Sequence, residues 1–172
     1  SIINVMKFLY STLVFILFSL SINAQQVEWV SKQGGTSTDQ TNDIATDTAG
    51  NVFIVGTFDG TATLGSLNIT TYGSGDIFLA KYNSTGTCLW VKKAGGTFGD
   101  EGRGIAVDSS GNIYITGIYG QSGAQFDGIS VGTTGGLRNG FVAKYSPAGD
   151  IIWVKRIGGT SSGPEPRKIT VK

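Results

Sequence analysis

The chain has 172 residues, with 13 basic and 12 acidic side chains, no histidine, one cysteine, three prolines and 27 glycines. Its hydrophobic content of 40% can support a buried core, which excludes a disordered chain. The balanced charge argues against a nucleic-acid-binding protein, because such proteins depend on clustered Lys and Arg. A chain without histidine also cannot form a Ser-His-Asp or Cys-His catalytic set or a histidine-based metal site.

Residues 1–24 have the layout of a secretory signal peptide. Met6 and Lys7 precede an apolar stretch over 8–22, and a small residue, Ala24, offers a cleavage site before Gln25. The alternative is a membrane anchor, but about 15 apolar residues are fewer than the ~20 that a spanning helix needs. We therefore expect export, with no stable membrane span after cleavage, to the outer cell surface or the medium.

The rest of the chain is a repeat. Its copies are EWVSKQGGT (28–36), LWVKKAGGT (89–97) and IWVKRIGGT (152–160), and, between them, DTAGNVFIVG (47–56) and DSSGNIYITG (108–117). The tryptophans of the first three segments, Trp29, Trp90 and Trp153, are 61 and 63 residues apart. A fixed period of this size indicates a repeat architecture.

Each period contains four strand-like runs, which in the second copy are 104–108, 112–119, 140–146 and 150–158. The phrase that begins at Asp108 predicts a hairpin turn between the first two runs. Its Asp can accept bonds from the backbone amides ahead of it, and Gly111 can take a positive φ. We therefore expect the phrase to serve a turn rather than catalysis. Four antiparallel strands per period of about 60 residues predict a β-propeller blade.

The predicted fold class is all-β, with two full repeats of four-stranded antiparallel blades at about 42–97 and 103–160. We also expect a preceding fourth strand over 27–33 and a third repeat that starts at 167–172, with its first strand at 168–171. Propellers close with 4–8 blades, so two repeats predict an incomplete ring and the N-terminal fragment of a longer protein, with the remaining blades of the same chain as partners. The isolated chain should aggregate or oligomerise through its exposed apolar faces.

The combination of GNxxxxG (50–56), AKY (80–82) and the closing GGT (95–97) resembles the SBBP-type β-propeller repeats of secreted bacterial proteins. Residues 56–97 are especially similar to the versions common in Bacteroidetes surface proteins. The resemblance covers about residues 27–172. It implies a propeller fold and says little about function, because structural residues define the family.

Acidic residues follow each GGT, where the rim of a propeller could bind a ligand. The segments 60–75 and 120–139 are predicted to be long irregular loops, which are suited to recognition. The candidate ligand residues are Asp39, Asp43, Tyr72, Asp100, Glu101, Arg103 and Arg138, and Glu165 is a further acid of this kind. Solvated turn acids are the alternative interpretation. The rim acids could also converge on Ca²⁺, a possibility that the sequence leaves open; no D-x-D-x-D-G run is present, so no residue is assigned to a metal and no cofactor is expected. Cys88 has apolar counterparts, Val27 and Ile151, which predict a buried core thiol.

Two classes of function remain open. The first, which we favour, is a non-enzymatic scaffold or binding module outside the cell that contacts protein or glycan through its loops. The second is the propeller part of a larger secreted enzyme, such as a glycan-active hydrolase, with catalysis in another part of the protein.

Overall fold

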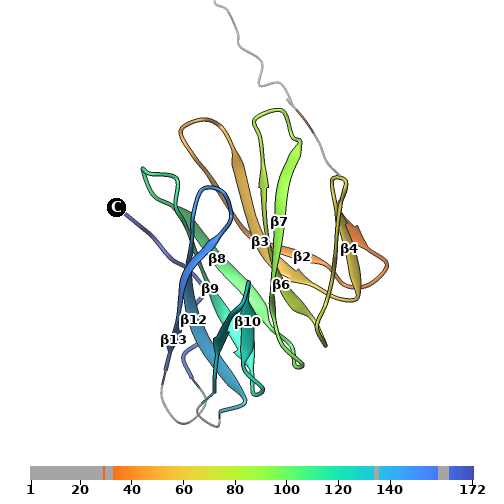
Figure 1. Ribbon diagram of the computed structural model, residues 1–172, viewed down its shortest axis with the longest axis vertical. Helices are drawn as coiled ribbons and strands as arrows, with labels where there is room; N and C mark the ends of the chain where they lie inside the picture. The colour runs from red at the N-terminus through yellow and green to blue at the C-terminus, as the bar shows by residue number, and fades with distance from the viewer. Residues whose placement is uncertain (1–28, 30–32, 134–135, 159–162) are drawn as a thin grey trace, which may run out of the picture.

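The computed structural model describes residue 29 and residues 33–133, 136–158 and 163–172. Within these residues every regular element is a β-strand, as Figure 1 shows, and the predicted all-β class is confirmed. The predicted signal peptide and most of the expected strand over 27–33 lie outside the described residues. The described part of the chain includes no helix suited to crossing a membrane.

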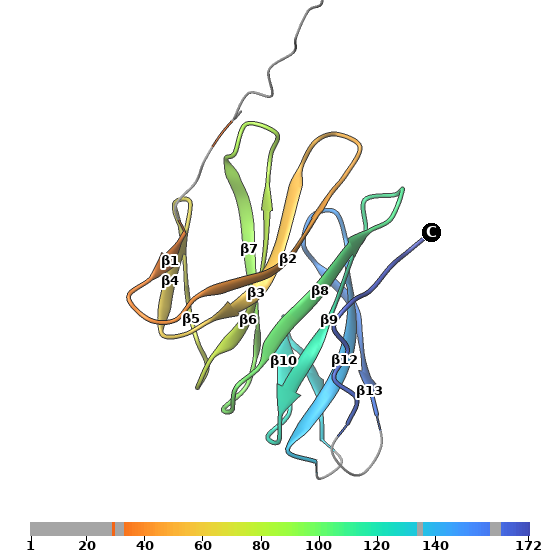
Figure 2. The same ribbon diagram turned by 180° about the vertical axis from the view of Figure 1, so that it is seen from behind.

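Two sheets of the same construction form most of the molecule and pack face to face (Figure 1 and Figure 2). Unit 1 consists of β2 (Gln40–Thr46), β3 (Val52–Phe58), β6 (Asp76–Tyr82) and β7 (Cys88–Gly95), antiparallel and paired in that order. Unit 2 consists of β8 (Glu101–Val107), β9 (Ile113–Gly120), β12 (Arg138–Tyr145) and β13 (Ile151–Ile157), paired in the same way. The predicted four-stranded blades are therefore confirmed, and the two units do not close a ring.

Each unit also carries a short hairpin between its second and third strands, so the prediction of irregular loops over 60–75 and 120–139 is wrong. The connecting hairpins are β4 (Thr61–Leu64) with β5 (Leu67–Thr70), and β10 (Ala124–Phe126) with β11 (Ile129–Val131). The second hairpin turns at Asp127 and Gly128, whose φ values of 47° and 92° are both positive, as a type I′ turn requires. Two-residue turns of this kind allow strands of only three or four residues.

Each connecting hairpin adds its first strand to the outer strand of the preceding unit. Gln125 of β10 is the partner of Gly95 in β7, and Thr63 of β4 is the partner of Gly34 in β1 (Gly34–Gly35). The two glycines are one period apart, so the pairing repeats in the same register. A Cβ on Gly96 would overlap the carbonyl oxygen of Gly123. The glycines of the GGT motif therefore leave the space in which the hairpin packs against the outer strand.

The repeated Asp-x-x-Gly-Asn phrase forms the β2–β3 and β8–β9 turns, as predicted. Asp108 Oδ1 accepts hydrogen bonds from the N–H groups of Ser110 (2.9 Å) and Asn112 (2.8 Å), and Oδ2 accepts one from Asn112 Nδ2 (2.8 Å). Asp47 makes the same three bonds in unit 1. The bond from the Asn112 side chain holds the pKa of Asp108 below its ordinary value.

The larger hydrophobic core lies between the two units. Unit 1 contributes Phe53, Val55, Ile77 and Leu79, and unit 2 contributes Ile105, Ile113, Ile115, Tyr119, Phe141, Ala143 and Tyr145. The second connecting hairpin adds Phe126, whose ring centroid is 4.9 Å from that of Phe141. Each fully buried aromatic side chain of this core contributes about 1.5–3 kcal/mol by leaving water. The hairpin thus ties the units together by packing as well as by strand pairing.

A second core covers the opposite face of unit 1. It is built from Ile54, Phe58, Phe78, Ala80 and Tyr82 of unit 1 and from Ala62, Leu64 and Ile69 of the first hairpin. Trp29 stacks on Tyr82 with ring centroids 6.0 Å apart and lies against Gly86. Trp90 lies in the same way against Gly149 of unit 2. The two tryptophans therefore make equivalent contacts with the unit that follows each of them.

An aromatic ladder crosses three strands of each unit. The two ladders are Phe53–Lys81–Trp90 in unit 1 and Tyr114–Lys144–Trp153 in unit 2. Lys81 Nζ lies 5.1 Å from the Phe53 ring centroid, and Lys144 Nζ lies 5.0 Å from that of Tyr114. The aromatic rings at the two ends of each ladder are 6.3 Å and 6.2 Å apart, respectively. Within their own sheets, Trp90 and Trp153 thus have equivalent surroundings.

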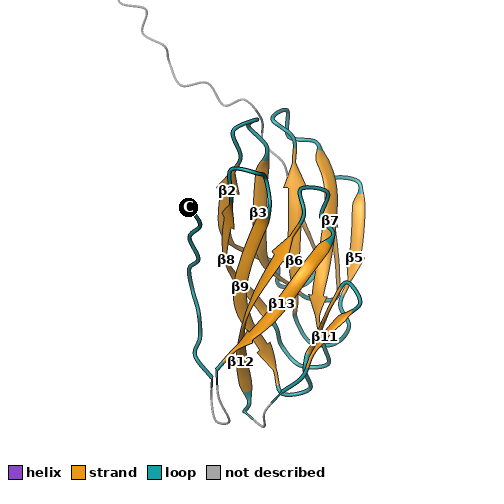
Figure 3. Cartoon of the chain, turned by 60° about the vertical axis from the view of Figure 1, so that its left-hand side comes forward, coloured by secondary structure: helices purple, strands orange, loops and turns teal. Residues whose placement is uncertain are grey.

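Residues 163–172 run beside unit 2 without forming a strand (Figure 3), so the predicted strand over 168–171 is wrong. The Gly163 N–H donates to Arg138 O (3.2 Å), as the Asp100 N–H donates to Gly75 O (2.8 Å) one period earlier. The segment therefore follows the path by which the chain enters unit 2. A strand needs a paired neighbour, and none of the strands in the described residues pairs with this segment.

Candidate functional site

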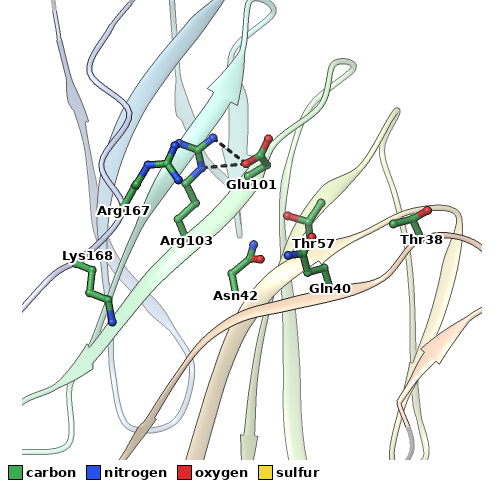
Figure 4. Close-up of a pocket in the computed structure, with 8 residues that line it drawn as sticks. All are labelled: Thr38, Gln40, Asn42, Thr57, Glu101, Arg103, Arg167 and Lys168. Atoms are coloured by element: carbon green, nitrogen blue, oxygen red, sulfur yellow. Dashed lines mark hydrogen bonds and ion pairs between the residues drawn. The ribbon is translucent and has the colours of Figure 1, made fainter.

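An open groove of about 670 Å³ lies along β2 and β8, the first strands of the two units (Figure 4). Its lining residues are Thr38, Gln40, Asn42, Thr57, Glu101, Arg103, Arg167 and Lys168. They come from both units and from the C-terminal segment, and all of them are polar or charged. The groove is therefore suited to a ligand that offers hydrogen-bonding and charged groups.

Arg103 is the centre of an ion-pair network at this groove. Its Nη2 is 2.8 Å from Glu101 Oε2, and its Nη1 is 3.0 Å from Glu165 Oε2. Arg138 approaches the same two glutamates at 3.7 and 3.8 Å. The Arg103 side chain is only 12% exposed, so its ion pairs are better shielded from water than those of a surface arginine. The network therefore fixes the wall of the groove.

The network also affects the charge state of Glu165. The hydrogen bond that Glu165 accepts from Arg103 holds the pKa of Glu165 below its ordinary value. A general acid requires a raised pKa, so Glu165 is a structural carboxylate at neutral pH rather than a proton donor.

The opposite wall of the groove connects unit 1 to unit 2. Asn42 Nδ2 donates to Gly102 O (2.7 Å), and Asp43 Oδ2 accepts the N–H of Ile105 (3.1 Å). Asp43 Oδ1 is also 3.8 Å from Lys168 Nζ. The polar side chains of β2 thus bond to the first strand of the next unit, where they help to hold the groove open at a fixed width.

Of the residues predicted from the sequence, the structure brings Glu101, Arg103 and Arg138 together, and Asp43 lies near the groove, where it contacts the lining residue Lys168. Asp39 and Asp100 occupy equivalent positions elsewhere and accept hydrogen bonds from the N–H groups of Gly35 and Gly96. Asp100 is 1% exposed, which excludes its interpretation as a solvated turn acid. Tyr72 also lies apart, beneath Lys93 Nζ at 3.7 Å from its ring centroid.

Cys88 packs against the second core and is half-buried rather than fully buried as predicted. Its Sγ lies 3.7 Å from Trp90 O, and burial raises the pKa of the thiol. A thiol with a raised pKa forms little thiolate, so Cys88 is a poor nucleophile.

The groove residues that sequence reasoning missed are Thr38, Gln40, Asn42, Thr57, Arg167 and Lys168, and it also missed the buried Asp76. A signal for Asn42 was present. NDIATD (42–47) and RGIAVD (103–108) align, and the position of Asn42 in one is that of Arg103 in the other. A polar position that changes inside an otherwise repeated strand is a candidate for a ligand-facing side chain. No such signal exists for the residues of the C-terminal segment.

The described residues contain no group of three or more Cys, Asp or Glu side chains with the geometry to hold a metal ion.

Residues 28–60 and 89–117 match the model of the SBBP beta-propeller repeat family. The two matches begin 61 residues apart, at the residues that precede Trp29 and Trp90. The chain is also similar to an uncharacterized WD repeat-containing protein, L264, of Acanthamoeba polyphaga mimivirus. The two are 28% identical over 73% of this chain, which corresponds to 11% of the length of the viral protein. The chain therefore spans about a tenth of that relative, and it is a β-propeller repeat domain in its fold.

Proposed function

We propose that this chain is part of an exported, non-enzymatic β-propeller that acts outside the cell as a binding scaffold. One observation carries the proposal. The residues that recur in each period, such as Asp108 and Trp90, are used in turns, ladders and contacts between units, whereas polar positions that line the open groove change between units 1 and 2, from Gln40 to Glu101 and from Asn42 to Arg103. Recognition at the groove can therefore vary while the scaffold stays the same.

The chemistry of the groove supports a protein partner ahead of a glycan. The side chains that line it offer both signs of charge as well as amide and hydroxyl groups, which suit an extended peptide segment with mixed polar side chains. None of these lining residues is aromatic, so the groove has no flat apolar surface for a sugar ring. A glycan is therefore the second candidate ligand, and the binding experiment described below tests it separately.

The alternative, the propeller portion of a larger secreted enzyme, has less support in the residues that form the groove. Glycoside hydrolysis needs a carboxylic acid with a raised pKa beside a second carboxylate. Glu101 and Glu165 both face Arg103, and the pKa of Glu165 is lowered. The acids at the groove therefore serve the scaffold.

Export to the outer cell surface or the medium rests on the amino-terminal 24 residues, whereas the similarity to Bacteroidetes surface proteins rests on residues 56–97. Fusing residues 6–30 to a periplasmic reporter tests this part of the proposal. Export with cleavage after Ala24 supports it, and a reporter that stays in the cytoplasm contradicts it.

Binding is tested with the chain from Gln25, which keeps every residue that the structure describes. A display library of random peptides and a glycan array are the probes. We expect peptides whose binding falls at least tenfold in the double variant Q40A/R167A, which changes two exposed groove residues. The matched control T48A/S109A changes exposed residues in the two Asp-x-x-Gly-Asn turns and should bind as the unchanged chain does. Equal binding by all three proteins, or binding to neither probe, would contradict a ligand site in the groove.

A further inference from the structure

Asp76 of β6 and Asp100, which precedes β8, lie together in the interior at the joint between the two units. They are 0% and 1% exposed. Both carboxyl groups lie beside Gly95, where an added Cβ would overlap Asp76 Oδ1 and would come within 2.8 Å of Asp100 Oδ2. A side chain at Gly95 would therefore fill the space that the two acids share.

The hydrogen bonds of Asp100 account for both of its oxygens. Its Oδ2 accepts the N–H of Gly96 (2.7 Å) and its Oδ1 accepts the N–H of Gly120 (2.9 Å) at the end of β9. Asp76 Oδ2 accepts the N–H of Tyr72, whereas Asp76 Oδ1 is buried and has no donor among the described residues. A buried carboxylate oxygen without a donor is costly, and the neighbouring acid can satisfy it only if one of the two carries a proton.

We propose that Asp76 and Asp100 share one proton and that this proton stabilises the contact between unit 1 and unit 2. The proton dissociates as the pH rises toward and above neutrality, which makes the contact pH-sensitive. With the proton in place, Asp76 and Asp100 are hydrogen-bonded across the joint. Without it, two negative charges face each other in the interior, and the loop that carries Asp100 separates from β6 and β9.

The surroundings of the pair favour the protonated form. Burial raises the pKa of Asp76 to about 6 and that of Asp100 to about 7, from the ordinary 3.8. Two other charged groups act on the pair: Lys93 of β7 lowers the pKa of Asp76, and Asp59, after β3, raises it.

The direction of the effect follows from linkage. An aspartate whose pKa is higher in the closed joint than in the open one takes up a proton when the joint closes. Closing is therefore most favourable near pH 4 and weakens as the pH rises to about 7. For one proton, the opening equilibrium rises about tenfold per pH unit in this range.

The repeat itself provides a test substitution. Asn139 occupies in unit 2 the position that Asp76 occupies in unit 1. Asp76→Asn should place an amide N–H where the shared proton lies, so the joint would stay closed without titrating. Asp100→Asn instead leaves the N–H of Gly96 or Gly120 without an acceptor.

The experiment follows amide hydrogen exchange at Gly96 and Gly120 by NMR between pH 5 and 7.5, in the chain from Gln25 and after correction for intrinsic exchange rates. We expect the unchanged chain to show about tenfold faster opening per pH unit up to pH 7. D76N should show no pH dependence, and D100N should exchange at least tenfold faster at every pH. D127N, which changes an exposed turn acid, is the matched control and should behave as the unchanged chain.

Three outcomes would overturn the proposal. One is pH-independent exchange in the unchanged chain, and another is a pH dependence that D76N retains. The third is slow exchange restored at pH 7.5 by millimolar Ca²⁺, because the pair would then hold a cation rather than a proton. A ¹³C titration of the two carboxyl groups gives a second readout. Two ordinary aspartate titrations near pH 4 would also contradict a shared proton.

Discussion

The face that unit 1 turns toward unit 2 and the corresponding face of unit 2 have the same framework but different side chains. Both carry an aromatic–lysine–tryptophan ladder with nearly equal spacings. Around the ladder, however, Tyr114 of unit 2 replaces Phe53, Thr116 replaces Val55, and Gly140 replaces Ile77. These three apolar residues of the core between the units are thus each exchanged for a smaller or more polar one, whereas Trp90 is kept as Trp153 and Ala94 becomes the larger Ile157.

The exchanged side chains are satisfied within unit 2. The Tyr114 hydroxyl donates to Asp108 Oδ2 (3.3 Å), and Thr116 Oγ1 donates to Phe141 O (2.6 Å). The ladder and the turns therefore define the sheet, whereas the residues between them match whatever covers that face. This face of unit 2 is therefore suited to different surroundings from the corresponding face of unit 1, which packs against unit 2.

Truncating the aromatic residue at the start of each ladder should give the largest difference between the two faces. Phe53 is fully buried between the units, so Phe53→Ala should lower the free energy of unfolding by about 3–5 kcal/mol. Tyr114 is half-buried, and Tyr114→Ala should cost about 1–2 kcal/mol. Urea denaturation of both variants measures the two costs. Equal losses would show that the faces are covered to the same extent.

Giving unit 2 an acid at the joint position should expose the difference in a pH-dependent way. Asn139 is 2% exposed, and Gly163 holds the position that Asp100 holds in the first joint. In Asn139→Asp the new carboxyl is buried without an acidic partner, so its pKa is raised. The variant should match the unchanged chain near pH 4 and lose about 2–3 kcal/mol of stability by pH 7, the equivalent of two pKa units. A loss that does not grow with pH would contradict this prediction.

The turns should instead behave alike in the two units. Asp47→Ala removes three hydrogen bonds from the β2–β3 turn and should cost about 1–2 kcal/mol, because the freed amides remain accessible to water. Asp108→Ala should destabilise in the same direction, with an additional loss of the bond from Tyr114. Thermal denaturation of both variants checks the equivalence, and a change in only one of them would contradict it.

Replacing the ladder lysines should have the smallest effect. Lys81 Nζ donates to Pro147 O (3.3 Å) across the joint, in addition to its position over Phe53. Lys81→Met should therefore cost about 0.5–1 kcal/mol. Lys144 makes the cation–π contact with Tyr114 but has no hydrogen bond across the joint in the described residues. Lys144→Met should therefore be nearly neutral. If Lys144→Met lowers the free energy of unfolding more than Lys81→Met does, the hydrogen bond across the joint makes no contribution to stability.

The period of the sequence was sufficient to predict the fold. Four apolar runs separated by Asp-x-x-Gly-Asn and similar turns leave few alternatives to a four-stranded sheet, and the equivalence of the ladder tryptophans follows from the period. The connecting hairpins were missed because β10 and β11 have only three residues each and are stabilised by contacts with the preceding unit. The signal for the second hairpin was the Asp127-Gly128 turn.

The groove was predicted only in part for a related reason. Sequence position placed Glu101 and Arg103 on the first strand of unit 2, but their meeting with Arg138, more than 30 residues later, depends on how the strands pair. The acids at Asp39 and Asp100 look alike in the sequence and bond to equivalent glycines. Burial distinguishes Asp100, since Asp76 from another strand lies beside it. Such a pairing has no local signature.

The connecting hairpins have a mechanical consequence. The outer strand of a sheet is normally the first to peel away when a protein is stretched. Here β7 is hydrogen-bonded to β6 on one edge and, at its C-terminal end, to β10 of the next unit on the other. A pulling force that reaches β7 is therefore shared with its neighbour, and the two sheets should yield together as one element under load rather than unravel strand by strand.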